Sequence, residues 1–417
     1  MDDDQRGGVD IEALTAEINH RLEDADAALA RDYPGERAGR QPVHTLYVPA
    51  DQVEPDLLAS YANRAQMSIV EFGAEFLDVL EGDEDLVGRV LAKLEREPIE
   101  DLRIDFEDGY GARSDDEEDE TVRETAAVVA RWVKDGAAPP FHGIRFKSLE
   151  PATRSRGLRT LAMYVEGLAG DGALPDGFVV TLPKVTSVDQ VEAMTVAAEC
   201  IEKDLSLRSG SLRFELQIET PQAVVGSDGT VQVARMIHAS AGRCVGLHYG
   251  TYDYSADLGI APAQQSLEHP AADHAKAVMQ AAVAGTGVRL SDGSTNVLPV
   301  GDADAVRSGW ELHARLVNRS LERGYYQGWD LHPAQLPSRF AATYAFYRAG
   351  FDAAAERLRN YLEQTGSNVM DEPATARALS DFVVRGVDCG AVSAAEVQAA
   401  TGLDGDRLTA LARPRRM

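Results

Sequence analysis

Residues 212–221, LRFELQIETP, and residues 242–260, GRCVGLHYGTYDYSADLGI, decide the fold of this chain. Each segment is a short apolar run followed by a carboxylate, Glu219 after the first run and Asp253 after the second. The two acids are 34 positions apart, close to the length of one strand–helix–strand repeat. Because the carboxyl ends of parallel strands meet on one face of an α/β domain, we expect both side chains on that face.

Two carboxylates brought close together repel each other unless a cation lies between them. Carboxylate oxygens favour Mg²⁺ or Mn²⁺ over Zn²⁺. The paired segments therefore predict a Mg²⁺ site, with Mn²⁺ as the alternative ion and with Glu219 and Asp253 as its protein ligands.

Short apolar strands alternate with helical segments along most of the chain. This alternation is typical of an α/β protein of the (β/α)₈ TIM-barrel class, and we assign the barrel, the catalytic domain, to residues 41–337. Residues 1–40 form an N-terminal helical extension whose amphipathic helix should lie on the main body, and residues 338–417 form a C-terminal helical region. The eight expected strands lie in HTLYVPAD, LRIDFEDG, FHGIRFKS, GFVVTLPKV, LRFELQIET, RCVGLHYG, GVRLSDG and YYQGWDLHP.

Composition excludes several classes of partner. The formal net charge of −27 over 417 residues argues against binding to nucleic acid or to anionic membranes. No apolar run reaches the ~20 residues needed to span a bilayer, and the first residues, MDDDQRGG, do not resemble a secretion signal. The three cysteines are scattered without paired spacing, which is typical of a reduced cytoplasmic protein. We therefore expect a soluble, cytoplasmic protein.

Familiar catalytic motifs are absent, but charged residues follow consecutive strands. The sequence contains no HExxH, CxxC, Walker, GxGxxG or GxSxG motif. Asp105 and Glu107 face the same way on an extended segment and would fix the water molecules around the metal. Arg145 offers a planar fork for a substrate carboxylate. These three side chains and the metal pair together predict a catalytic site at the barrel mouth.

Two further residues have open roles. Lys184 would contact substrate, either as a Schiff-base nucleophile or as a charge-paired ammonium group; the preceding proline and the nearby carboxylates favour the ammonium. His248 lies beside the metal pair in sequence, where contact with substrate and simple packing are both open.

Six segments resemble, in order and rough spacing, the HpcH/HpaI aldolase and citrate lyase β-subunit-like family, over roughly residues 44–380. Two of them are also similar to segments of malate synthases. The resemblance implies that Glu219 and Asp253 bind Mg²⁺, that Arg145 binds an oxo acid, and that Asp105 and Glu107 line the metal's water shell. The six segments are DFEDG, IRFKS, TLPKV, QIETP, VGLHYGTYDYSADLG and GYYQGWDLHPAQL.

A seventh segment, GSNVMDEPA, resembles a C-terminal motif of the same family, whose aspartate reaches an active site, often that of a neighbouring subunit. The matching residue is Asp371, which the resemblance implies as the general base. Its alternative role is to cap the helix that follows Pro373. The same resemblance implies a homo-oligomer, either a trimer or a hexamer.

One departure from the family pattern concerns coenzyme A. Family members begin the first strand with Arg-Ser, whose arginine helps to hold a coenzyme A phosphate, whereas this chain has His44 and Thr45. Arg154, Arg156 and Arg159 could replace that arginine, or they could belong to a solvated helix start.

The expected function is that of a Mg²⁺-dependent carbon–carbon lyase or aldolase. Its substrate would be a 2-oxo or hydroxy acid, such as a pyruvate, oxaloacetate or glyoxylate derivative, or an acyl-CoA thioester, and it would react through a metal-stabilised enolate. The alternatives are a malate-synthase-like Claisen condensation, a thioesterase acting on a CoA ester, and a non-catalytic ligand-binding or scaffold barrel.

Overall fold

Eight parallel strands form the barrel that the sequence predicts. The computed structural model describes residues 9–37, 39–170, 172–363 and 372–413. Its strands follow the order β7-β6-β5-β4-β3-β2-β1-β8, and a parallel bridge between Ser291 and Gln327 brings the two edges of the sheet together. The strands are β1 His44–Pro49, β2 Asp101–Asp105, β3 Phe141–Arg145, β4 Val180–Leu182, β5 Phe214–Ile218, β6 Cys244–Tyr249, β7 Arg289–Ser291 and β8 Gly328–Asp330.

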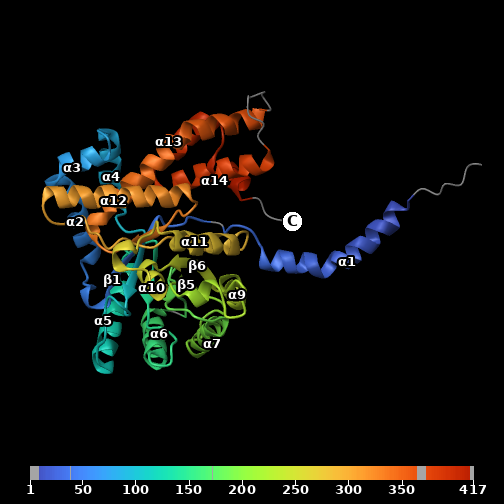
Figure 1. The fold of residues 1–417 in the computed structure, drawn as a ribbon, viewed down its shortest axis with the longest axis horizontal. Helices are drawn as coiled ribbons and strands as arrows, with labels where there is room; N and C mark the ends of the chain where they lie inside the picture. The colour runs from blue at the N-terminus through green and yellow to red at the C-terminus, as the bar shows by residue number, and fades with distance from the viewer. Residues whose placement is uncertain (1–8, 38, 171, 364–371, 414–417) are drawn as a thin grey trace, which may run out of the picture.

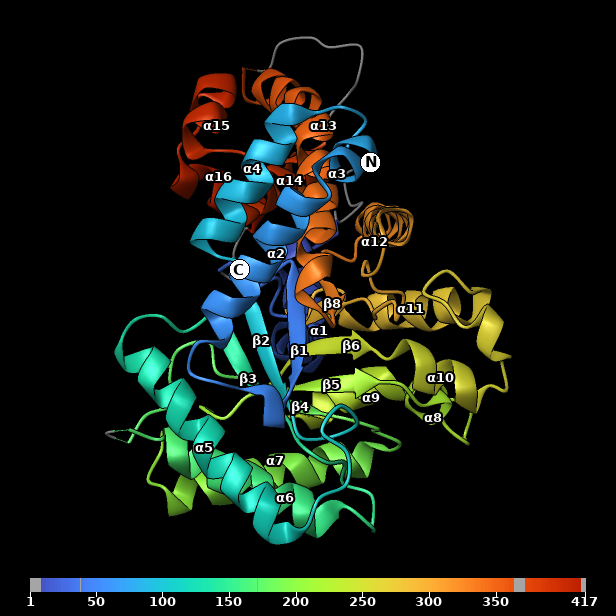
Figure 2. The same ribbon diagram turned by 90° about the vertical axis from the view of Figure 1, so that its left-hand side faces the viewer.

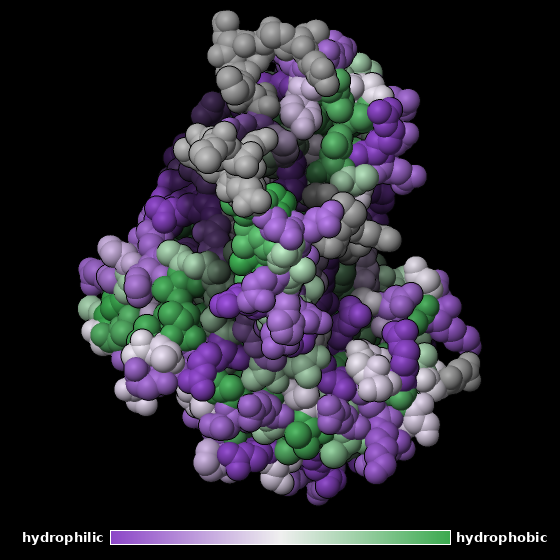
Figure 3. Space-filling view, turned by 90° about the vertical axis from the view of Figure 1, so that its right-hand side faces the viewer, coloured by the Kyte–Doolittle hydropathy of each residue, from purple (hydrophilic) through white to green (hydrophobic). Residues whose placement is uncertain are grey.

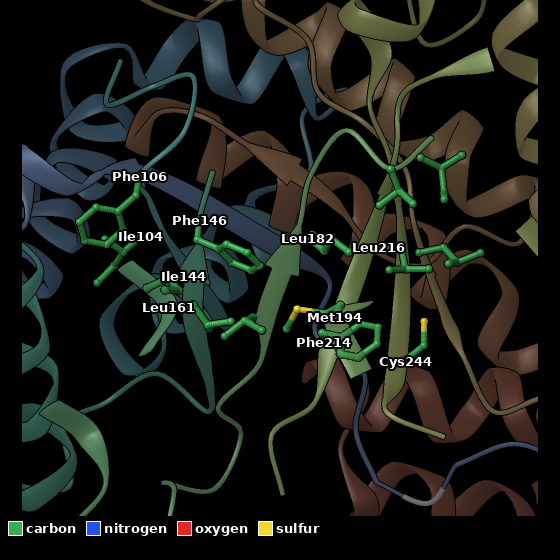
Figure 4. Packing of buried hydrophobic residues seen from close by; sticks show 14 of the residues in the cluster. Ile104, Phe106, Ile144, Phe146, Leu161, Leu182, Met194, Phe214, Leu216 and Cys244 are labelled. Atoms are coloured by element: carbon green, nitrogen blue, oxygen red, sulfur yellow. The ribbon is translucent and has the colours of Figure 1, made fainter. Parts of the chain in front are cut away.

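Helices cover the outside of the barrel and bury its outward-facing residues. In β5, Phe214 and Leu216 point outward and lie beside Met194 of α7 (Figure 4). Alternate residues of a strand point to opposite faces, so the remaining β5 positions face the barrel interior. The covering elements are α5 Asp115–Lys134, α6 Arg154–Leu168, α7 Val188–Asp204, α8 Pro221–Val224, α9 Gln232–Ala239, α10 Thr251–Asp257, η2 Pro262–Gln264, α11 Pro270–Val283 and α12 Ala303–Glu322.

A second hydrophobic core lies beside the barrel (Figure 2). It joins the long crossover between β1 and β2 to the C-terminal helices, and Phe76 of the crossover packs edge-on against Trp310 with ring centroids 5.0 Å apart. The crossover and the C-terminal region contain η1 Ala50–Gln52, α2 Leu57–Glu71, α3 Gly73–Val79, α4 Glu84–Arg96, η3 Pro333–Gln335, α13 Leu336–Glu363, α14 Pro373–Cys389, α15 Ala394–Thr401 and α16 Gly405–Ala412.

A buried polar cluster connects the barrel to this second core. Asp330, at the end of β8, is fully buried and accepts hydrogen bonds from the Arg339 guanidinium of α13, the shortest at 2.9 Å. His313 Nε2 lies 3.1 Å and His44 Nδ1 3.4 Å from the same carboxylate. Charged groups are rarely fully buried unless they are paired, so this cluster fixes β8 against α12 and α13.

The N-terminal helix differs from its prediction. Helix α1, Ile11–Asp32, forms where expected, but none of its residues is buried, and it projects away from the main body (Figure 1). The expectation that it lies on the body is therefore wrong: within the described residues, no surface of the chain covers its apolar stripe. The stripe includes Ile11, Leu14, Ile18, Leu22 and Leu29.

The surface seen from the side on which α1 projects is mainly hydrophilic, with hydrophobic residues in small patches (Figure 3). Within the described ranges, no helix has the length and apolarity required to cross a membrane.

Candidate active site

Strand β5 and the turn after it supply a column of polar side chains to the barrel interior. Glu215, Gln217 and Glu219 occupy alternate positions and are all buried. Gly250 makes room for the last of them, because a Cβ atom at this position would lie 2.3 Å from the Cβ of Glu219. The sequence therefore positions Glu219 at the carboxyl end of the barrel by a strand alternation and by a neighbouring residue without a side chain.

Glu219 is a buried carboxylate with two hydrogen bonds. Its Oε1 accepts from the backbone N–H of Lys184 at 2.8 Å, and its Oε2 accepts from the Gln217 side-chain amide. Burial raises the pKa of Glu219 well above its usual range, and Asp253 and Glu107 add to that rise, although Lys184 and Arg145 oppose it. A carboxylate in this position is stabilised in its charged form by a further nearby cation.

Lys184 links the acids at the mouth of the barrel. Its φ angle is 50°, in the left-handed region that residues other than glycine seldom adopt. Its Nζ donates to Glu107 and, at 2.7 Å, to Asp108, and lies 3.8 Å from Asp253. Burial lowers the pKa of Lys184, but Glu107 and Glu219 outweigh this effect and raise it above its ordinary value. The lysine is therefore a charge-paired ammonium group, as the sequence favoured.

Arg145 is held in place by Asp105. Its Nε and Nη2 donate to the two Asp105 oxygens at 2.7 and 2.6 Å. Its Nη1 lies 3.4 Å from both Glu107 and Gln217. Asp105 thus orients the guanidinium, and its Oδ1 also accepts from the backbone N–H of Glu107 at 3.0 Å. Nη1 therefore makes longer contacts than Nε and Nη2 do.

His248 lies deeper in the barrel than the acids of the mouth. It is buried, its Nε2 is 3.1 Å from Glu215, and its Nδ1 accepts from the Trp329 indole at 2.8 Å. Both ring nitrogens are therefore used within the barrel. The same Glu215 pairs with Arg103 at 2.9 Å. Sequence reasoning missed Arg103 and Glu215, although the polar alternation along β2 and β5 carried the signal.

Three other predictions concern coenzyme A and the general base. His44 Nε2 accepts the Glu100 N–H at 3.1 Å inside the protein. Arg156 and Arg159 are both paired with Asp119, Arg156 at 2.7 Å, so both guanidinium groups have carboxylate partners within the protein. Asp371 lies outside the described residues.

The donor set at the mouth fits a divalent cation. No group of three or more potential metal-binding side chains converges within the described ranges, so Glu219 and Asp253 would leave most coordination positions to water and substrate. Mg²⁺ is commonly held in this way, by one or two carboxylates together with water. The mouth also has an excess of negative charge, with two cations, Arg145 and Lys184, among five carboxylates: Asp105, Glu107, Asp108, Glu219 and Asp253.

The fold and these side chains define a (β/α)₈ barrel protein with an acidic site at the carboxyl ends of its strands. The family model described as a domain of unknown function, DUF6986, matches residues 22–416, and the chain belongs to this family. A comparison with curated proteins finds no match.

Solved structures of the same fold include a citrate lyase from Burkholderia xenovorans LB400, with 19% sequence identity and a TM-score of 0.57, covering 89% of this chain and 99% of that one. They also include a lead(II) complex of Haloferax volcanii malate synthase, with 18% identity and a TM-score of 0.51, covering 90% of this chain and 89% of that one. A pyruvate and acetyl-CoA ternary complex of that synthase has 16% identity and a TM-score of 0.50, covering 84% and 82%. The resemblance to the citrate lyase and malate synthase superfamily is thus confirmed at the level of fold.

The ion pairs of Lys184 predict the result of a trapping experiment. Because a protonated amine is not a nucleophile, borohydride added with pyruvate should leave the mass of the protein unchanged. Intact-protein mass spectrometry measures this, with a known Schiff-base aldolase as the positive control. An adduct that is lost in Lys184→Arg would contradict the assignment.

Proposed function

We propose that this protein is a Mg²⁺-dependent carbon–carbon lyase or aldolase that acts on a 2-oxo or hydroxy acid. The observation that carries the proposal is the buried Glu219 beside Asp253, at the carboxyl end of the barrel, in a mouth with more carboxylates than cations. The lead(II) ion, pyruvate and acetyl-CoA bound by the similar malate synthase support a divalent metal and a 2-oxo acid.

Each side chain has a role in this proposal. Glu219 and Asp253 would hold Mg²⁺, which when bound supplies a positive charge that stabilises the negative charge developing on a substrate carbonyl oxygen. Arg145, oriented by Asp105, binds the substrate carboxylate through its Nη1 edge. Lys184 keeps Glu107 in place, where its carboxylate would accept hydrogen bonds from water molecules on a bound metal ion.

A direct test of this function is exchange of the pyruvate methyl protons with deuterium, followed by nuclear magnetic resonance. The purified protein should catalyse exchange with Mg²⁺ and lose this activity in EDTA. A protein that neither exchanges these protons nor binds Mg²⁺ would instead be the non-catalytic barrel.

A malate-synthase-like condensation is the second candidate, favoured by the fold shared with an enzyme that binds acetyl-CoA. It is separated from a simple lyase by assaying glyoxylate-dependent release of free CoA from acetyl-CoA. Release without glyoxylate would instead indicate a thioesterase.

Asp371 is the proposed general base, and the deuterium assay tests it. Asp371→Asn should reduce methyl exchange by about 100-fold or more, within the range that positioned general bases contribute, and should leave Mg²⁺ and pyruvate binding unchanged. Glu372→Gln, at the neighbouring position, is the matched control. The N-cap position of α14 is Glu372, so the capping alternative does not apply to the start of this helix. Unchanged exchange in Asp371→Asn would exclude Asp371 as the general base.

We further propose a cytoplasmic homo-oligomer, a trimer or a hexamer, in which the segment containing Asp371 serves a neighbouring subunit. Its flanking helix ends, at Glu363 of α13 and Pro373 of α14, lie at the far side of the helical region from β5 and β6 in both ribbon views (Figures 1 and 2).

The apolar stripe of α1 is the proposed contact between subunits. Placing charge in it should weaken self-association, because buried charge without a partner is costly. Ile18→Glu together with Leu22→Glu should lower the mass measured by light scattering, whereas Glu17→Gln on the same helix should not. An unchanged mass would exclude α1 from the interface.

A further inference from the structure

A cavity lies at the opposite end of the barrel from the proposed active site. Its volume is 380 Å³, and its lining includes the first residues of three strands, Asp101 of β2, Phe141 of β3 and Arg289 of β7. Glu219 and Asp253 follow the carboxyl ends of β5 and β6, so the cavity shares no residue with them. Active sites of barrels of this type occupy the carboxyl face, and this cavity is therefore unexplained by the proposed reaction.

Arginines dominate the charge of the cavity. Arg37, Arg208, Arg213 and Arg289 all line it, and none has an ion-paired carboxylate within the part of the chain that the structure describes. The one acid of the lining that is not itself paired is Asp176, which is exposed. In a chain with a formal net charge of −27, four such arginines around one cavity run against the overall composition.

The arginines also repel one another. Burial lowers the pKa of Arg37, and Arg213 lowers it further. Burial, together with Arg385, Arg413 and Arg37, lowers the pKa of Arg289 to about 10. Both groups still carry full charge at neutral pH. Backbone carbonyls accept from them, Cys244 O from Arg37 at 3.1 Å and Gly39 O from Arg289 at 3.0 Å, but carbonyls supply no negative charge.

Buried polar atoms without hydrogen-bond partners are a second, independent indication that the cavity binds an anion. Ser211 Oγ, Arg40 Nε and Arg103 Nε are buried without a hydrogen-bond partner, and all three residues belong to the lining. Buried polar atoms without partners are uncommon and cost free energy. A bound oxyanion would offer acceptors to this end of the barrel as well as charge.

Part of the remaining wall is apolar. Phe141, Phe178 and Pro175 line the cavity beside the arginines, and the Arg289 guanidinium lies 6.0 Å from the Phe141 ring centroid. The volume falls at the lower end of the range of small-molecule sites, about 300–1,000 Å³. Planar guanidinium groups match the geometry of phosphate, and several together bind it through charge-assisted hydrogen bonds. We propose that this cavity binds a small phosphate ester, with its phosphate on the arginines and its carbon portion against the two phenylalanines.

Calorimetric titration of the full-length protein tests the site, at constant ionic strength, with inorganic phosphate, AMP, glucose 6-phosphate and glycerol 3-phosphate as probes. At least one ester should bind about tenfold more tightly than inorganic phosphate, because only an ester reaches the apolar wall. Arg208→Gln and Arg213→Gln change exposed side chains that the fold does not need. Each substitution should lower the affinity of the protein for that ester by about tenfold, the contribution of one charge-assisted hydrogen bond.

Arg307→Gln, an exposed arginine of α12 outside the cavity, is the matched control and should leave the affinity unchanged. The proposal is overturned if no ester binds more tightly than inorganic phosphate, or if the two cavity variants bind as the unmodified protein does. Neither result would bear on the metal-dependent activity, which is measured with separate assays.

Discussion

Glu219→Gln is expected to lower Mg²⁺ affinity by about 100-fold or more and to abolish methyl-proton exchange, since changes even outside the ligand shell of a metal cost 10- to 100-fold. The substitution preserves shape and keeps an acceptor for the Lys184 N–H, which Glu219 Oε1 accepts at 2.8 Å. It removes the charge, and it puts an amide nitrogen in place of Oε2, which accepts from the Gln217 amide. Calorimetric titration with Mg²⁺ and the deuterium exchange assay measure the two losses.

The thermal stability of Glu219→Gln without Mg²⁺ should rise or stay the same, in contrast to its Mg²⁺ affinity and activity, which should fall. Burial disfavours the charged form of Glu219, and the nearby Asp253 and Glu107 carboxylates add to this effect. The amide variant should therefore melt at or above the temperature of the unmodified protein without Mg²⁺, because a charge that costs free energy is gone. Glu192→Gln, on the exposed face of α7, is the control and should change neither property. Full exchange activity in Glu219→Gln would remove the metal assignment.

Most of the barrel could be predicted from the sequence because its strands are short apolar runs ending in charge. The alternation of Phe214, Leu216 and Ile218 with Glu215 and Gln217 follows directly from the two-residue repeat of a strand. The same repeat predicts that Glu219 points into the barrel. The local sequence pattern was sufficient to predict the direction of a side chain wherever that direction depends on its own strand alone.

Contacts across the barrel could not be predicted in this way. Arg145 has the residue type expected for a substrate carboxylate, but its partner Asp105 lies on the neighbouring strand, in register with it. Arg103 and Glu215 meet across an interval of 112 residues. Such pairings depend on strand order and register, which a single sequence does not specify.

The N-terminal helix shows a related limit. Its period predicted an apolar face correctly, yet periodicity carries no information about which surface covers that face. Within the described chain nothing covers it. The cavity at the amino ends of the strands likewise combines the segment around Arg37 with Arg208, Arg213 and Arg289. None of these arginines is close to all the others in sequence.

Asp330→Ala should destabilise the protein by about 3–5 kcal/mol, the cost of leaving a buried charge without its partner. Asp330 accepts from Arg339 at 2.9 Å and lies 3.1 Å from His313, and neither Asp330 nor Arg339 has more than slight exposure. Burial opposes the ionisation of Asp330, but Arg339 and His313 hold its pKa well below its usual range. Urea unfolding followed by circular dichroism measures the loss.

Two variants separate the buried ion pair from general disturbance of the site. Asp85→Ala removes an exposed partner of Arg89 on α4, at 2.7 Å, and should cost no more than about 0.5 kcal/mol. Asp330→Leu combined with Arg339→Leu removes both charges and should regain much of the stability that Asp330→Ala loses, because apolar residues of similar volume replace buried pairs at little cost. If the double variant is as unstable as the single one, the cluster acts through shape and packing between β8 and α13, and its charges contribute little. If Asp330→Ala loses no more unfolding free energy than Asp85→Ala does, the two cores are held together by the aromatic contacts around Trp310 instead.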